Sequence, residues 1–367
     1  MRRAARIDKL LALCITVLLL GGGMLFASAA FGLLARGATN ISSVVFSHLV
    51  LGVGAGVVAL LIASRIDYKL WRRFAPHLYV LALIATAAVF IPHLGAEHGG
   101  GRRWIILAGV SFQPSEALKI GSIILAAAYF GGIKGRIEDI RYGLGGLLLI
   151  LAGPVVLLLA QPDLGTLGVI VISVVAIFLA AGARYRDLIL MVLLGIIALV
   201  VLASVRPYVL DRMTVFFNPS QAPQAEGYQI KQSLIAIGSG GFMGRGFGQG
   251  IQKFTYLPEP MGDSIFAVAG EEFGFVGSIV LIGIFLAFAL RGLSVGARAP
   301  DLFGALLAIG ISTYLVSEAF INIGAMLGVA PLTGIPLTFI SQGGSAMLVS
   351  LASAGILLSV SRNKARN

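Results

Sequence analysis

Long apolar runs recur along the whole chain, and they limit the folds it can adopt more than any other feature. The runs are roughly 16 to 25 residues long, and about 20 helical residues suffice to cross the hydrocarbon core of a bilayer. The composition agrees, because 58% of the residues are apolar and only 12% are charged. The mean hydropathy is +0.96. We therefore predict an all-α, polytopic bundle of transmembrane helices.

Ten spans can be placed on the sequence, each to within several residues. The first is too long for the apolar region of a cleaved signal peptide, so we expect it to be retained. Because no segment has the composition of a soluble domain, we treat residues 1–367 as one membrane domain. The spans are residues 10–35, 46–64, 77–92, 117–132, 144–160, 164–182, 187–204, 264–291, 302–328 and 344–361.

Basic residues predict the orientation of these spans. With the N-terminus inside, most of the 27 lysines and arginines fall in cytoplasmic segments, as the positive-inside rule requires. Both termini are then cytoplasmic. The net charge of +11 comes from residues that flank apolar segments, which favours contact with membrane lipid and not with nucleic acid. Cys14 lies in the first span, so no internal disulfide is expected.

Most of the remaining polar sequence falls on the outer side. Residues 205–263 form one large extracytoplasmic loop, whose apolar and glycine-rich content predicts short amphipathic helices at the membrane interface. Its glycine-rich stretch, residues 238–250, lacks the spacing of a nucleotide-binding motif. Its glycines could serve to form tight turns, or they could let the backbone approach a diphosphate ligand closely. Gln161-Pro-Asp163 is interpreted as a tight outer turn between two spans.

Asp263 is the strongest candidate for chemistry. It ends the polar sequence Tyr256-Leu-Pro-Glu-Pro-Met-Gly-Asp263 and directly precedes the apolar sequence that begins at Ser264. This position puts a carboxylate at the mouth of a span, where an ionisable group is costly and is a functional hypothesis by default. A role as helix N-cap is the structural alternative, and it is compatible with catalysis.

Three further acids fall inside predicted spans. Glu271 lies eight residues after Asp263, on roughly the same helical face and two turns deeper, and Glu272 follows it. Glu318 and Asn322 form an i, i+4 pair in the ninth span. Acids at such positions must face the bundle interior or a cavity.

Two other groups of polar residues lie near the outer ends of spans. Arg102, Arg103 and Trp104 could bind a phosphate or could anchor a helix in the interface. Glu116 and Lys119 share one helical face, and Asp163 lies at a similar depth, so we expect these three to pair. This cluster is either a structural lock between helices or the floor of a polar cavity. The four histidines show no metal-ligand spacing.

Several motifs, in order along most of the chain, resemble those of the shape, elongation, division and sporulation (SEDS) family, the FtsW and RodA group. The form Gln252-Lys-Phe-Thr-Tyr-Leu-Pro-Glu259 is more similar to the FtsW branch. The motifs are Gly101-Arg-Arg-Trp-Ile, Phe112-Gln-Pro-Ser-Glu-Ala-Leu-Lys119, Gln161-Pro-Asp-Leu-Gly-Thr166, Gly227-Tyr-Gln-Ile-Lys-Gln-Ser233, the form just given, Ala269-Gly-Glu-Glu-Phe-Gly274, Pro331-Leu-Thr-Gly-Ile-Pro-Leu-Thr-Phe-Ile-Ser341 and Gly343-Gly-Ser345.

The resemblance implies a peptidoglycan glycosyltransferase in the bacterial cytoplasmic membrane, with its active site facing outside. It would polymerise lipid II onto an undecaprenyl-diphosphate-linked glycan during division or elongation, and Asp263 would be the general base of an inverting reaction. The expected partners are a class B penicillin-binding protein and other divisome or elongasome membrane proteins. The resemblance does not decide whether the reaction requires a divalent cation such as Mg²⁺ or Mn²⁺. Substrate contacts are expected from Arg102, Arg103, Trp104, Lys231, Arg245 and Glu259, and Arg212 is a further outer cation.

The chain departs from the family pattern at two places. Pro260-Met-Gly262 precedes Asp263 where the family usually has Ala-His-Thr, and Gln342 replaces a tyrosine. These changes put the neighbouring substrate contacts in doubt. A lipid II flippase that uses Glu271, Glu272 and Glu318, and a non-catalytic scaffold, remain as alternative functions.

Overall fold

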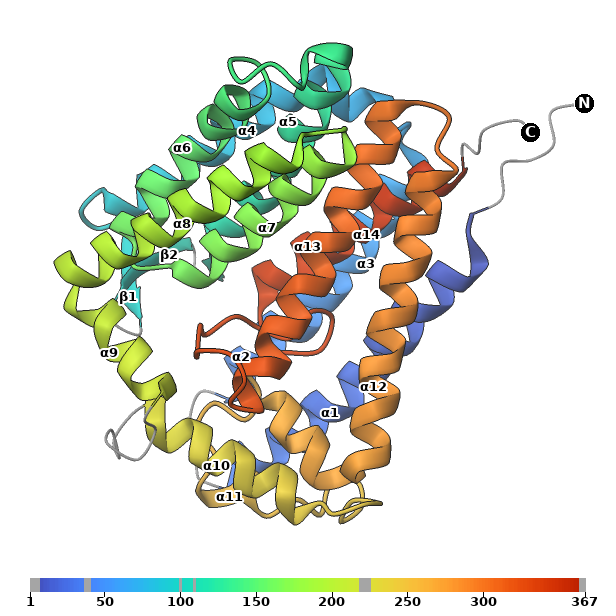
Figure 1. Cartoon of the computed structure of the whole chain (residues 1–367). Helices are drawn as coiled ribbons and strands as arrows, with labels where there is room; N and C mark the ends of the chain where they lie inside the picture. Colours follow the sequence, from blue (N-terminus) through green and yellow to red (C-terminus); the bar gives the residue numbers. More distant parts are fainter. Residues whose placement is uncertain (1–6, 36–40, 99–100, 108–109, 218–225, 363–367) are drawn as a thin grey trace, which may run out of the picture.

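The computed structural model describes residues 7–35, 41–98, 101–107, 110–217 and 226–362, and they form a helical bundle (Figure 1). Eight helices are long and apolar enough to cross a membrane, and two shorter apolar helices accompany them. Each of the ten predicted spans corresponds to one of these helices, so the predicted polytopic bundle is confirmed. That all ten cross the bilayer stays a prediction.

The ten apolar helices follow the chain in a simple order. They are α1 (Lys9–Ala35); α2 (Ile41–Phe46), which continues through a π-helical segment (Ser47–Gly54) into α3 (Ala55–Arg65); α4 (Lys69–Ala87), extended by a 3₁₀ turn (Ala88–Phe90); α5 (Pro114–Ile133), followed by a 3₁₀ turn (Lys134–Arg136); α6 (Leu144–Ala160); α7 (Leu164–Ala180); α8 (Tyr185–Val205); α12 (Ile265–Ala297); α13 (Leu302–Met326); and α14 (Gly344–Arg362).

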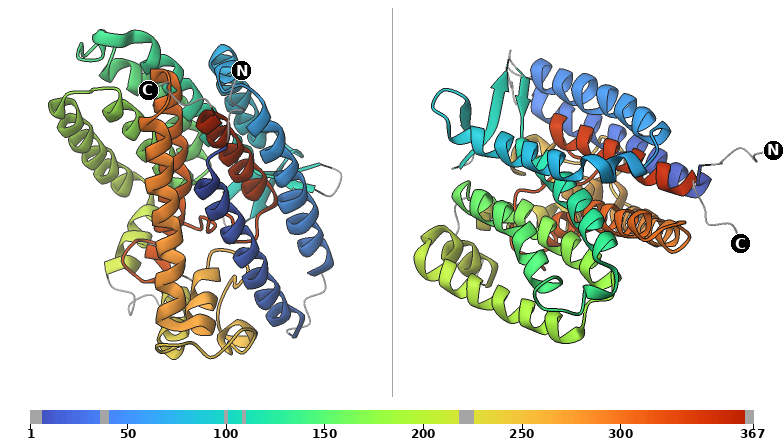
Figure 2. Two further views of the ribbon diagram at one scale, coloured as in Figure 1. Left: turned by 90° about the vertical axis from the view of Figure 1, so that its right-hand side faces the viewer. Right: turned by 90° about the horizontal axis from the view of Figure 1, so that it is seen from above.

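The core is centred on α13, which packs against α5, α7, α12 and α14. Small residues let neighbouring helices approach closely, as is common in membrane bundles. A Cβ atom added at Gly355 of α14 would lie only 2.5 Å from the carbonyl oxygen of Leu60 in α3. By contrast, α8 stands at the edge of the bundle (Figure 2), and Asp187 is the only buried residue on it.

Two features differ from the sequence-based expectation. A small antiparallel sheet in the order β1 (Gly95–His98), β2 (Gly101–Leu107), β3 (Val110–Phe112) interrupts the all-α architecture. In addition, α12 is not one straight span, because Gly274 has φ 66° and ψ −160° and bends the helix sharply. Only glycine adopts this conformation without strain.

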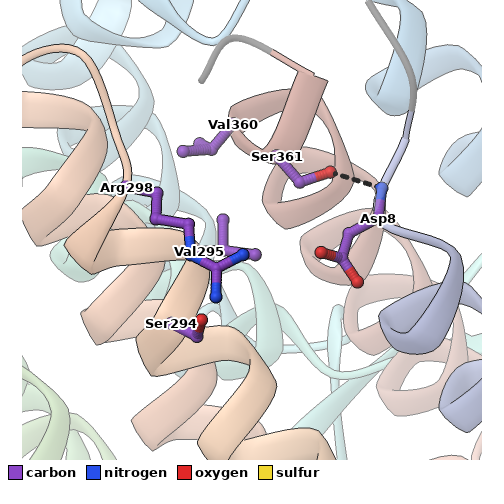
Figure 3. A pocket seen from close by; sticks show the side chains of 6 residues that line it. All are labelled: Asp8, Ser294, Val295, Arg298, Val360 and Ser361. Atoms are coloured by element: carbon purple, nitrogen blue, oxygen red, sulfur yellow. Dashed lines mark hydrogen bonds between the residues drawn. The ribbon is translucent and has the colours of Figure 1, made fainter. Parts of the chain in front are cut away.

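The outer loop contains the short helices that its composition predicts. They are α9 (Pro207–Phe217), α10 (Glu226–Ser239) and α11 (Gln252–Thr255). Residues 218–225 of the predicted loop lie outside the described residues. At the opposite end of the bundle, Arg291 donates two hydrogen bonds of 2.7 and 2.8 Å to the carboxylate of Asp8. The backbone N–H of Asp8 also donates to Ser361 Oγ at 3.2 Å (Figure 3), so the residue that precedes α1 contacts the last turn of α14.

Candidate active site

The segment that carries Asp263 is held by the loop between α13 and α14. The backbone N–H of Gln342 donates to the carbonyl of Met261 at 2.7 Å, and Ser341 Oγ donates to the carbonyl of Gly262 at 2.7 Å. Asn322 Nδ2 of α13 donates to the backbone carbonyl of Asp263 at 2.8 Å. Three consecutive carbonyl groups are thus fixed, so the position of Asp263 depends on hydrogen bonds that span 59 to 81 positions in sequence.

Asp263 faces a polar cavity of about 470 Å³. Its wall comes from the π-helical segment, the sheet, the first turns of α5 and α7, α9, α10 and the loop between α13 and α14. The polar and charged lining residues are Ser47, His48, Arg103, Trp104, Ser111, Gln113, Glu116, Asp163, Thr166, Arg212, Gln229, Glu259, Asp263, Thr333 and Gln342. Residues from parts of the fold that are far apart in sequence therefore converge on one cavity.

The surroundings of Asp263 tune its acidity. Burial raises the pKa of the Asp263 carboxyl to about 6, and the nearby charge of Glu259 adds to the increase. The side chain of Gln229 opposes the shift, because its Nε2 donates to Asp263 Oδ1 at 3.0 Å. Asp263 is not the N-cap of α12, since that position belongs to Ser264. The capping alternative is therefore wrong.

The predicted cations separate into two groups. Arg103 lines the cavity, where its guanidinium also donates to the carbonyl groups of Gln161 and Pro162 in the turn between α6 and α7. Arg212 of α9 lines the cavity as well. Arg102 and Lys231 are exposed outside the cavity lining, and Arg245 lies 3.7 Å from Glu271.

The predicted polar cluster forms with a different third member. Lys119 Nζ lies 2.8 Å from Glu116 and 2.6 Å from Glu318, and all three side chains are almost fully buried. Asp163 does not bond to this lysine. Its carboxylate instead caps α7 by accepting from the backbone N–H of Thr166 at 3.2 Å, and accepts from Gln113 Nε2 at 3.3 Å. The pairing expected for Asp163 is therefore wrong, because the start of a helix offers it a nearer donor.

Glu271 and Glu272 do not extend the site along α12. Glu271 accepts from the backbone N–H groups of Ile251 and Gln252, and Glu272 pairs with the buried Lys253 and with Ser28. Neither acid lines the cavity. The expectation that Glu271 lies deeper in the same site as Asp263 is therefore wrong, because both acids are held by contacts with residues 251–253 and with Ser28.

The glycine-rich stretch is built for close packing. A Cβ atom at Gly244, where φ is +83°, would lie 2.1 Å from the carbonyl oxygen of Glu272. No described residue of this stretch lines the cavity. Of its two interpretations, the structure favours the tight turn.

Sequence reasoning missed several residues of the site. Gln229 positions Asp263, and His48 and Thr333 line the cavity. The sequence pairs Asn322 only with Glu318 and does not predict its contact with the carbonyl of Asp263. Gln229 lies in the Gly227-Tyr-Gln motif, which could have drawn attention to it. His48 carries no local signal, because only packing brings it to the cavity. Of the two family departures, Met261 is buried and Gln342 lines the cavity.

Among the described residues there is no group of three or more histidines, cysteines or acids that could hold a metal ion. Glu259 and Asp263 are nevertheless two carboxylates in one cavity. Mg²⁺ is commonly held by one or two carboxylates together with the phosphates of a substrate. The pair therefore suits a cation that arrives with a diphosphate.

Comparison with known proteins identifies the family to which the chain belongs. Residues 9–366 match the family model of the FtsW, RodA and SpoVE cell cycle proteins. Stage V sporulation protein E of Bacillus subtilis (strain 168) is 37% identical over 96% of both chains. A probable peptidoglycan glycosyltransferase FtsW of Geobacter sp. (strain M18) is 38% identical over 83% of both chains.

Solved structures agree over nearly the whole length. A chain of a peptidoglycan synthase complex, studied for its coordination of polymerization and crosslinking, superposes with a TM-score of 0.76 at 25% identity, covering 97% of this chain and 98% of that one. The rod shape determining protein RodA of Thermus thermophilus superposes with a TM-score of 0.70 at 25% identity, covering 98% of both chains. The chain belongs to the FtsW, RodA and SpoVE family of cell cycle proteins.

Proposed function

We propose that this protein is a peptidoglycan glycosyltransferase that polymerises lipid II, with Asp263 as its general base. The observation that carries the proposal is a single cavity in which Asp263, with a pKa raised to about 6, shares the wall with Arg103 and Arg212. Family membership supports the reaction class, because FtsW relatives are named as probable peptidoglycan glycosyltransferases.

The chemistry requires a base and a cationic surface. The 4-hydroxyl of the acceptor attacks the anomeric carbon of the donor, and a new C–O bond forms as the C–O bond to undecaprenyl diphosphate breaks. Asp263 accepts the hydroxyl proton. The forked guanidinium groups of Arg103 and Arg212 suit the departing diphosphate, and attack from the face opposite to it inverts the anomeric centre. Glu259 is the residue that would hold a divalent cation, and the cation would supply further stabilisation of the negative charge on the leaving diphosphate.

The cellular setting follows from the same family. The chain is a multi-pass protein of the bacterial cytoplasmic membrane. We place the cavity on the outer face and both termini in the cytoplasm. A transpeptidase partner is supported by the similarity to a chain of a peptidoglycan synthase complex, and a class B penicillin-binding protein is the partner we propose. The flippase alternative loses support, because Glu271 and Glu272 hold the outer loop and Glu318 pairs with Lys119.

Replacement of Asp263 by asparagine tests the proposal. Asp263→Asn keeps the shape of the side chain and removes the proton acceptor, so polymerisation of lipid II in detergent micelles should fall by roughly 10²–10⁴-fold. Detergent-solubilised substrate bypasses transport, which separates polymerisation from flipping. The melting temperature should be unchanged or higher, because an amide is less costly to bury than a charge.

Asp139→Asn is the matched control, since Asp139 is an exposed aspartate in the turn between α5 and α6. It should polymerise like the wild type. If Asp263→Asn kept more than about a tenth of wild-type polymerisation, it would lie outside the range of a general base and Asp263 would not be the base.

A further inference from the structure

His48 is a buried polar residue in the cavity wall that the proposed chemistry does not use. It is the second residue of the π-helical segment Ser47–Gly54, and only 1% of its surface is exposed. Its ring stacks on Phe26 of α1, with the ring centroids 3.9 Å apart and the planes at 21°. Within the described part of the chain, its Nδ1 atom has no hydrogen-bond partner.

Tight packing fixes this ring. The π-helical segment lies against α14, where a Cβ atom added at Gly344 would be 2.9 Å from Ser47 Oγ. Phe26 belongs to the same small apolar cluster as Met261, which lies two residues before Asp263. The imidazole is therefore held rigidly between the cavity and the segment that carries the proposed base. Single π-helical turns within α-helices are frequent at functional sites.

An unpartnered ring nitrogen at such a place needs a partner. Buried polar groups in proteins nearly always have hydrogen bonds, and exceptions at a cavity wall point to a missing ligand. A second buried polar atom of the same lining, Thr333 Oγ1, also has no partner among the described residues. A neutral imidazole offers one donor and one acceptor, which matches a sugar hydroxyl or an acetamido group. The diphosphate is a better ligand for the guanidinium groups of Arg103 and Arg212 than for a neutral imidazole.

We propose that His48 is a substrate-binding residue whose ring forms a hydrogen bond with a hydroxyl or acetamido group of the bound lipid-linked saccharide. This role rests on the proposed function. It adds a specificity contact contributed by the π-helical segment, and it requires the ring stacked on Phe26 to present a polar edge to the substrate.

Three substitutions separate polarity from packing. His48→Phe keeps an aromatic ring on Phe26 and removes both nitrogens. His48→Asn removes the ring and places a polar group near the position of Nδ1, and His48→Ala removes both properties. His77→Phe is the matched control, because His77 is an exposed histidine on α4. Binding of fluorescent lipid II and steady-state polymerisation are measured for each variant in detergent.

We expect His48→Phe to weaken lipid II binding and to raise KM by about tenfold, the effect of one lost hydrogen bond, with a smaller change in kcat and an unchanged melting temperature. His48→Asn should recover part of the binding, and His77→Phe should behave like the wild type. A fully active His48→Phe together with an impaired His48→Asn would mean that the ring only packs, and would overturn the proposal. If His48→Phe does not fold, equal KM values for His48→Asn and His48→Ala would overturn it.

The binding measurement also distinguishes this proposal from the assignment of the base. Asp263→Asn should bind lipid II while losing polymerisation, so an error about the base leaves the His48 comparison intact. If the wild-type protein bound no lipid II, the proposed function and the role of His48 would fail together. If it bound lipid II equally well with and without the imidazole, only the role of His48 would fail.

Discussion

At the scale of single residues, the surroundings of Asp263 matter as much as its identity. Its carboxyl is close to Glu259, and burial and this neighbour raise its pKa to about 6. A base with a pKa near the working pH is both largely ionised and a good proton acceptor. At pH 7, a group with this pKa is about nine-tenths ionised. The hydrogen bond from Gln229 to Oδ1 lowers the pKa of Asp263 and so partly offsets the effect of burial.

This pKa predicts how activity depends on pH. The base acts when deprotonated, so kcat/KM should rise with pH up to about 6 and then level off. Gln229→Leu removes a hydrogen bond that lowers the pKa of Asp263, so the midpoint should move to higher pH. Polymerisation of lipid II between pH 5 and 8 measures both curves. Gln249→Leu, at an exposed position, should leave the midpoint in place. A wild-type kcat/KM that stays constant from pH 8 down to pH 5 would contradict the raised pKa.

At the scale of elements, buried ion pairs and bends position the helices around the cavity. Lys119 of α5 joins Glu116 of its own helix to Glu318 of α13. At the bend of α12 at Gly274 the outer loop packs against the helix, where the backbone N–H groups of Phe275 and Val276, directly after the bend, donate to the carbonyl groups of Gly241 and Phe242. Both features support the cavity without contributing a reacting group.

The triad of Lys119, Glu116 and Glu318 should be strongly coupled. Lys119→Met leaves two buried carboxylates without a cation, at a cost on the order of 3–5 kcal/mol of stability. Adding Glu318→Gln removes one of these charges and should recover part of the loss. Thermal unfolding in detergent, with polymerisation as a second readout, measures the coupling.

An exposed ion pair provides the comparison for this triad. Arg184 and Glu138 are 49% and 56% exposed, so Arg184→Met should change the melting temperature little. Strictly additive effects of Lys119→Met and Glu318→Gln would show that the buried residues do not interact.

At the scale of the whole molecule, a bundle of apolar helices encloses a cavity lined by polar and charged side chains. Asp8, just before the first helix, contacts Arg291 of α12 and Ser361 in the last helix. An even number of crossings is the arrangement that puts both ends on one side, as the distribution of basic residues predicts. The organisation of residues 1–367 as one membrane domain also stays a prediction.

Labelling of engineered cysteines tests this topology. In a Cys14→Ala background, Gln249→Cys in the outer loop should react with an impermeant thiol reagent added to intact cells. Arg136→Cys, in the turn between α5 and α6, should react only after the membrane is opened. Both residues are exposed in the structure, so accessibility within the protein does not distinguish them. Labelling of Arg136→Cys in intact cells would contradict the proposed orientation.

The sequence alone determined the structural class of the protein and singled out Asp263 as the candidate catalytic residue. Repeated long apolar runs predicted a helical membrane bundle, because a helix of about 20 apolar residues is long enough to cross the hydrocarbon core and satisfies its own backbone hydrogen bonds there. A carboxylate at the start of one such helix marked Asp263, because a charge at that depth is costly. The turn at residues 161–163 was also readable, since proline and aspartate stop one helix and start the next.

Only the tertiary structure decided which groups meet. Glu318, and not Asp163, completes the ion-pair triad with Lys119. The contacts of Glu271 and Glu272 with the outer loop keep those acids out of the cavity, and packing of α1 against the π-helical segment brings His48 into its wall. Local periodicity can assign a side chain to a face of its own helix, but the partner on another helix depends on how helices cross and rotate. Those angles are set by packing over the whole bundle.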